Sequence, residues 1–77
     1  MVEFNKSAVG KAIRCIRKEH KLSQEVLSGL AGIARSHLAM IENNTKQPNF
    51  ETIWRIATAL DMPPHKLVKK IEEANSK

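Results

Sequence analysis

The chain has 77 residues, which is enough for one small domain with a single hydrophobic core. Thirteen Lys and Arg residues against eight Asp and Glu residues give a net charge of +5, which suits a polyanionic partner. A single cysteine, Cys15, excludes an intrachain disulfide, and no apolar run approaches the roughly 20 residues that span a bilayer. We therefore expect a cytoplasmic binding module, with no membrane association and no enzymatic activity.

The first predicted helix covers roughly Ser7 to His20. Apolar residues recur along it at positions i, i+3, i+4 and i+7, which indicates one buried stripe. The members of this stripe are Val9, Ala12, Ile13 and Ile16. Basic residues fall on the other side of the same helix, at Lys11, Arg14 and Lys18.

The run from Leu22 to Asn44 predicts two short helices joined by a tight turn, with the motif itself over residues 23–43. Ser23 is a typical N-cap for the first helix, and Gly32 can adopt the positive φ that ends it. The predicted inward faces are Val26, Leu27, Leu30 and Ala31 in the first helix, then Leu38 and Ile41 in the second. Asn43 and Asn44 end the second helix, because Asn tolerates the left-handed conformation.

Two further helices are predicted beyond Pro48. Asn49 caps the fourth helix, and Pro64 fits the first turn of the fifth. The predicted buried stripe of the fourth helix is Phe50, Ile53, Ile56, Ala57 and Leu60, and the fifth carries Leu67, Val68 and Ile71 before a polar tail over residues 72–77. The prediction is thus a compact all-α domain of five helices, with residues 1–77 as a single domain.

From about Val9 to Leu67 the chain resembles the lambda-repressor-like, Cro/C1-type helix-turn-helix family of transcriptional regulators. The matching residues are Ile13, Arg14, Arg17, Leu22, Ser23, Gln24, Glu25, Leu27, Gly32, Leu38, Ile41, Glu42, Pro48, Ile56, Ala57, Ala59, Leu60 and Leu67. Each match alone is weak, whereas their joint spacing is specific. The resemblance implies sequence-specific binding of double-stranded DNA, with the helix over residues 34–43 in the major groove.

The resemblance also implies which residues contact DNA. The positions facing base edges are Arg35, Ser36, Ala39 and Met40, and Arg35 is the strongest candidate because a guanidinium matches the O6 and N7 acceptors of guanine. The positions facing phosphates are Gln24, His37, Asn43, Thr45, Lys46 and Asn49. The alternative for Arg35 and for Gln24 is an ordinary solvated helix residue.

Other positions have structural roles by the same resemblance. Arg17 and Glu42 match the family's ion pair between the first helix and the end of the recognition helix, although Arg17 could instead contact phosphate. Ser28 occupies the position where the two motif helices cross. Two residues depart from the favourable pattern: Ala34 replaces the usual Ser or Thr cap, and Gly29 lowers the helix propensity of the first motif helix.

A domain of this size covers one half of an operator, so we expect a homodimer on a palindromic site. Trp54, Val68 and Ile71 are the candidate dimer interface, since restriction-modification controllers of this family dimerise through the corresponding end. Packing of Trp54 against the fifth helix within one chain is the alternative. No metal-ligand spacing or phosphate-binding loop is visible, so no cofactor or metal is expected. The rival function is a protein-binding adaptor or antitoxin-like partner with the same fold.

Overall fold

Five α-helices and no β-strand make up residues 3–76, the part of the chain that the computed structural model describes. They are α1 (Ser7–Glu19), α2 (Gln24–Ala31), α3 (Arg35–Glu42), α4 (Phe50–Ala59) and α5 (Pro64–Asn75). The predicted all-α class with five helices is confirmed. The first helix ends one residue earlier than predicted, and α5 continues through Asn75, so most of the predicted polar tail is helical.

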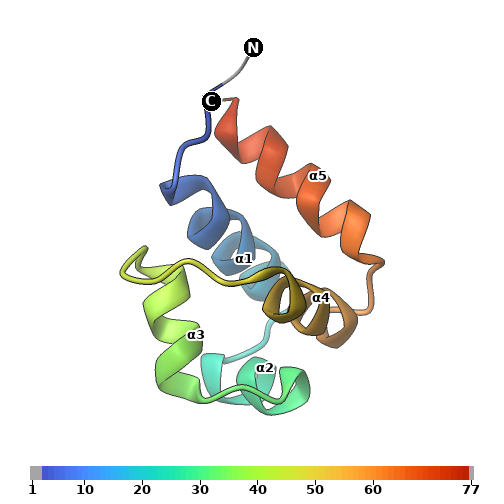
Figure 1. Cartoon of the computed structure of the whole chain (residues 1–77). Helices are drawn as coiled ribbons and strands as arrows, with labels where there is room; N and C mark the ends of the chain where they lie inside the picture. Colours follow the sequence, from blue (N-terminus) through green and yellow to red (C-terminus); the bar gives the residue numbers. More distant parts are fainter. Residues whose placement is uncertain (1–2, 77) are drawn as a thin grey trace.

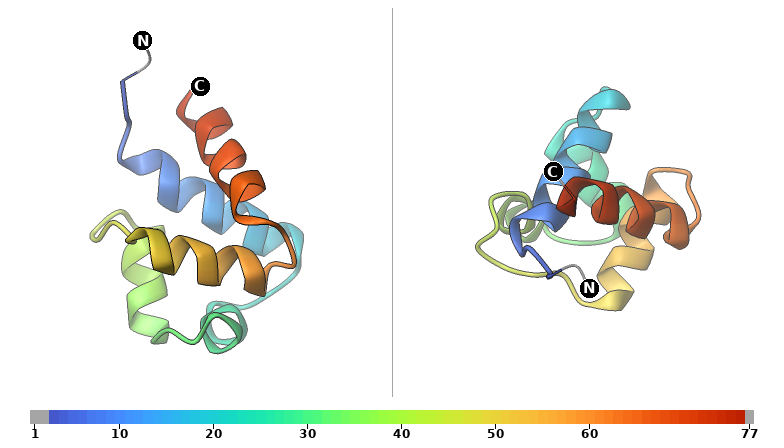
Figure 2. Two further views of the ribbon diagram at one scale, coloured as in Figure 1. Left: turned by 45° about the vertical axis from the view of Figure 1, so that its right-hand side comes forward. Right: turned by 90° about the horizontal axis from the view of Figure 1, so that it is seen from above.

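Helix α1 lies between α3 and α5 and packs against both. The motif helices α2 and α3 also contact each other, and α4 packs against both α2 and α5. Figure 1 shows α2 and α3 at one end of the molecule and α5 at the other, and the left view of Figure 2 shows the same order. The α2–α3 pair is therefore left open to solvent on its outer side.

All five helices contribute to one hydrophobic core. Its largest side chains, each less than 2% exposed, are Ile13, Leu27, Leu38, Ile41, Ile56, Leu60 and Leu67. Burial of a Leu or Ile side chain stabilises a fold by about 1.5–3 kcal/mol, whereas helices of 8 to 13 residues are marginal in isolation. The helices consequently depend on this shared core.

The predicted buried stripe of α2 is wrong at two of its four positions. Val26 is 47% exposed and Leu30 is 63% exposed, whereas Leu27 and Ala31 are buried as predicted. The buried face is rotated toward Ser28, which is only 3% exposed. Val26 and Leu30, four residues apart, are consequently turned outward together.

The predicted stripe of α4 is wrong at its first residue. Phe50 is 67% exposed, and Thr52 occupies the buried position in the first turn instead. The Phe50 ring lies edge-on to Trp54, one turn later, with ring centroids 6.1 Å apart and an interplanar angle of 69°. The two aromatic side chains therefore form a pair on the surface of α4 rather than contributing to the core.

Four of the helices end in the same hydrogen-bonded turn, in which one residue adopts positive φ. The residue after it donates its N–H to a carbonyl five positions earlier, which satisfies a free carbonyl of the last helical turn. The positive-φ residues are Lys21, Gly32, Asn44 and Asp61. The corresponding bonds are Leu22 to Arg17 (3.1 Å), Ile33 to Ser28 (3.0 Å), Thr45 to Met40 (2.9 Å) and Met62 to Ala57 (3.0 Å).

The predicted endings at Gly32 and Asn44 are confirmed, as are two predicted caps. The Ser23 hydroxyl accepts from the Val26 N–H at 3.0 Å, and the Asn49 side-chain oxygen accepts from the Thr52 N–H at 2.8 Å. At the start of α3 the cap position is Ala34, and no side chain caps this helix.

We predict that alanine at two helical glycines has opposite effects on stability. A Cβ at Gly29 would meet no atom within 4 Å, so Gly29→Ala should raise the free energy of unfolding by about 0.5–1 kcal/mol. A Cβ at Gly10 would lie 2.3 Å from the Ile41 carbonyl oxygen and 2.9 Å from that of Glu42, where α1 crosses the end of α3. Gly10→Ala should therefore destabilise the fold. Urea unfolding of both variants tests the pair, and a stable Gly10→Ala protein would contradict this close approach.

Candidate nucleic-acid interface

A buried ion pair joins α1 to the end of α3. Arg17 Nε donates to Glu42 Oε2 at 2.7 Å and Arg17 Nη2 donates to Glu42 Oε1 at 3.0 Å, so the contact is bidentate. The two side chains are 10% and 3% exposed, respectively. Hydrogen bonding to Glu42 raises the pKa of Arg17 above its ordinary value, which keeps the guanidinium charged. This is the structural pair that the sequence analysis expected at these two positions.

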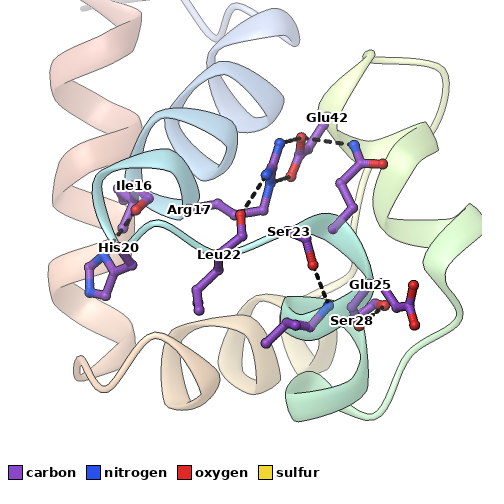
Figure 3. A network of polar contacts seen from close by, with 10 residues as sticks. Ile16, Arg17, His20, Leu22, Ser23, Glu25, Ser28 and Glu42 are labelled. Carbon is purple, nitrogen blue, oxygen red and sulfur yellow. Dashed lines mark hydrogen bonds and ion pairs between the residues drawn. The ribbon is translucent and has the colours of Figure 1, made fainter.

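The same pair also fixes the start of α2. Arg17 Nη1 donates to the Leu22 carbonyl oxygen at 2.8 Å, directly before the Ser23 cap, as Figure 3 shows. Gln24, the first residue of α2, donates from Nε2 to Glu42 Oε1 at 3.1 Å. The Gln24 side chain is half-buried and held in one orientation by this contact. Three chain segments therefore meet at the Glu42 carboxylate.

The outward face of α3 carries the predicted base-contact residues. Arg35 and Ser36 are exposed in its first turn, and Ala39 and Met40 lie one turn further on the same face, half-buried. Leu38, Ile41 and Glu42 occupy the opposite face and are buried. His37 is half-buried at the edge between the two faces. The structure thus brings the four predicted base-contact residues onto one surface and leaves His37 beside it.

The connector from α3 to α4 carries the remaining predicted phosphate contacts. Asn43, Thr45, Lys46 and Asn49 are all exposed. The Asn43 side-chain oxygen accepts from the N–H of Thr45 at 3.0 Å and from its hydroxyl. The oxygen of Asn49 is occupied by its cap bond to Thr52. Both asparagine oxygens therefore shape the connector, while their amide N–H groups are the parts able to donate to an anion.

A separate apolar patch, formed by Phe50, Trp54 and Val68, lies between α4 and α5. Trp54 is 53% exposed and Val68 is 45% exposed, and together with Phe50, Pro64 and His65 they line a shallow groove. Packing within the chain thus leaves about half of the Trp54 side chain open. Ile71 differs from its two predicted companions, because it is half-buried and packs against the core.

Sequence reasoning missed Phe50 as part of this patch. The spacing of Phe50 and Trp54 by four residues was a usable signal, since such aromatic residues meet on one helix face. It also missed Gly10, whose role follows from a crossing of two helices that no local pattern reveals.

Among residues 3–76, no group of three His, Cys, Asp or Glu side chains could hold a metal ion, and none of the five helices has the length and apolar character of a membrane-spanning segment.

This arrangement defines a helix-turn-helix module. Its first helix has a side-chain N-cap, its turn contains a glycine, and the outward face of its second helix is open to solvent. The chain belongs to the helix-turn-helix domain family, whose model matches residues 10–73. The chain is also 44% identical over 52 residues to the immunity repressor protein of Bacillus phage phi105, a match covering 68% of this chain and 36% of the repressor. It therefore spans about a third of that relative's length. The resemblance to lambda-repressor-like regulators is confirmed.

Solved structures of restriction-modification controller proteins have the same fold. The controller C.AhdI from Aeromonas hydrophila is 34% identical, with a TM-score of 0.77 over 80% of this chain and 94% of the controller. The controller C.Esp1396I, solved as a tetramer with its natural 35 base-pair operator, has a TM-score of 0.88. That match covers 97% of this chain and 99% of the controller at 23% identity, and so establishes likeness of fold.

We predict that loss of Glu42 is far more costly than loss of an exposed carboxylate. Glu42→Ala leaves the buried Arg17 charge without its partner and should lower the free energy of unfolding by about 3–5 kcal/mol. The control is Glu51→Ala, whose partner Arg55 lies 3.3 Å away with both side chains at least half exposed, and which should cost under about 1 kcal/mol.

The double variant Arg17→Met/Glu42→Leu distinguishes two contributions to the lost stability: the cost of leaving one buried charge unpaired, and the loss of the attraction between the two charges. It removes both charges and should recover much of the stability that Glu42→Ala loses. Urea unfolding near 10 °C measures all four proteins. Equal losses for Glu42→Ala and Glu51→Ala would contradict the buried character of the pair.

Proposed function

We propose that this chain is a sequence-specific transcriptional regulator that binds double-stranded DNA, with α3 in the major groove. The observation that carries the proposal is the outward face of α3, where Arg35, Ser36, Ala39 and Met40 lie together while the opposite face is buried. The first residues of such a helix contact base edges in this fold. Arg35 then pairs with guanine, Ser36 bonds a base or a phosphate, and Met40 contacts a thymine methyl group.

Phosphate contacts on both sides of α3 would hold it in register. On one side Gln24 presents its amide at the start of α2, pre-oriented by Glu42. On the other side Asn43, Thr45, Lys46 and Asn49 form the connector to α4, and His37 lies at the edge of α3. The net charge of +5 favours association with the backbone. On this proposal residues 1–77 act as one DNA-binding unit in the cytoplasm, without a cofactor.

We predict that Arg35→Ala weakens binding to the preferred duplex by about 1–3 kcal/mol and barely changes binding to unrelated duplexes. The preferred duplex would first be selected from a random pool with the wild-type protein. Arg35→Lys is the matched control, because it keeps the charge and loses the planar fork that fits guanine. It should retain non-specific affinity and lose discrimination. Wild-type protein that binds every duplex equally at moderate salt would refute sequence-specific recognition.

We further propose that the protein binds its operator as a homodimer through the apolar patch of Phe50, Trp54 and Val68, with Ile71 at its margin. One chain covers only half of a palindromic site, and paired recognition helices need a separation of about 34 Å. Exposed aromatic residues are enriched at such interfaces. A protein-binding adaptor would use the same patch for a different partner, which self-association measurements distinguish.

We predict that Trp54→Ala shifts the protein toward monomer. Wild-type protein should sediment as a dimer at high micromolar concentration, and the fluorescence of its only tryptophan should shift to the blue on association as the ring is buried. Leu30→Ala is the matched control, because Leu30 is a comparably exposed apolar residue on α2, outside the patch. Wild-type protein that remains monomeric at that concentration would refute the patch as a dimer interface and favour the adaptor.

A further inference from the structure

A basic groove runs between α1 and the C-terminal end of α3. Lys11, Arg14 and Lys18 line it from α1, and Glu42 and Asn44 line it from the end of α3. The three cations follow the spacing i, i+3 and i+7, so they share one face of α1, and all three are exposed. We use the name basic groove for this surface.

The groove carries a nearly uncompensated positive charge. The ion pairs within residues 3–76 join Arg17 to Glu42, Arg55 to Glu51 and Lys70 to Glu73, and none of them involves a cation of the groove. Its one acidic side chain, Glu42, is already neutralised by Arg17. An exposed surface of this kind attracts a polyanion.

The groove is also continuous with the proposed DNA surface. Glu42, which lines the groove, accepts a hydrogen bond from the Gln24 amide, and Asn44, which also lines it, lies in the connector with Asn43, Thr45 and Lys46. The basic groove lies at the C-terminal end of α3, about 10 Å from Arg35 along this eight-residue helix. The cations of the groove therefore lie away from the base-contact end of α3, which suits contacts to the backbone rather than to base edges.

We infer that the basic groove binds the sugar-phosphate backbone of the operator next to the base pairs that α3 contacts. Seven residues separate Lys11 from Lys18, or about 10 Å of helix axis, which matches the rise of about three base pairs at 3.4 Å each. The cations therefore follow a short run of phosphates and contribute affinity without sequence discrimination. This inference rests on the DNA-binding function proposed above and extends its contact surface along the duplex.

The test compares two duplexes that contain the selected site, one ending at the site and one extended by about ten base pairs on each side. The triple variant Lys11→Ala/Arg14→Ala/Lys18→Ala should bind the long duplex roughly tenfold or more weakly than wild type. Its slope of log K against log salt should fall by about 2–3 for each bound chain, because each lost phosphate contact removes about 0.9. On the short duplex the difference should largely vanish.

The matched control is Lys66→Ala/Lys69→Ala/Lys70→Ala on α5, which removes the same charge from exposed positions outside the groove. Equal losses for the two triple variants would show a general charge effect and overturn the inference, as would an unchanged salt slope in the groove variant. Failure of the proposed function has a different signature, in which the wild-type protein itself shows no preferred duplex and Arg35→Ala changes nothing.

A second measurement needs no destabilising substitution. Cys15 is the only cysteine, is exposed, and lines the basic groove, so its rate of reaction with a maleimide reports on access to this surface. Bound long duplex should slow the labelling of wild-type protein, whereas bound short duplex should slow it much less. Unchanged labelling in a saturated complex with the long duplex would overturn the inference even if the triple variant failed to fold.

Discussion

One carboxylate, that of Glu42, sets the geometry on which the rest of the α2–α3 end depends. It stands at the last position of α3, and it accepts hydrogen bonds from Arg17 of α1 and from Gln24 of α2. Charges taken out of water are costly unless every polar atom finds a partner. Here that condition holds, since no buried side-chain nitrogen or oxygen within residues 3–76 lacks a hydrogen bond. The pair therefore fixes how α2 sits relative to α3, and its main contribution is orientation.

The surface is divided between two kinds of chemistry. Polar and basic groups surround α3 and the groove beside α1, whereas Phe50, Trp54 and Val68 form an apolar patch between α4 and α5. Helix α1 lies between the two surfaces, since it contacts both α3 and α5. A charged surface suits a solvated polyanion, and an apolar patch suits a second protein surface. The two proposed interactions therefore do not compete for the same residues.

Local chemistry explains which features could be predicted from the sequence. Caps and turns such as Ser23, Asn49 and Gly32 depend on neighbouring backbone, so a short window of sequence contains the necessary information. The buried face of a helix is harder to predict, because it depends on the neighbouring helices. Periodicity predicts that Leu30 and Phe50 are buried, because it marks apolar residues without showing which side of the helix its neighbours cover, and both side chains are exposed. The residues proposed to contact DNA came from the family resemblance, and the structure adds the contacts that orient them.

The repeated helix endings have a consequence for how fast the chain reaches this structure. Each ending closes a ring of six residues and each connector is short, so the helix ends and turns form from local contacts, whereas the packing of α1 against α5 brings together the two ends of the described chain. Folding rates rise as contacts become more local, and small helical domains of this kind fold in microseconds to milliseconds. A newly made chain would then reach its folded form well before it met a partner.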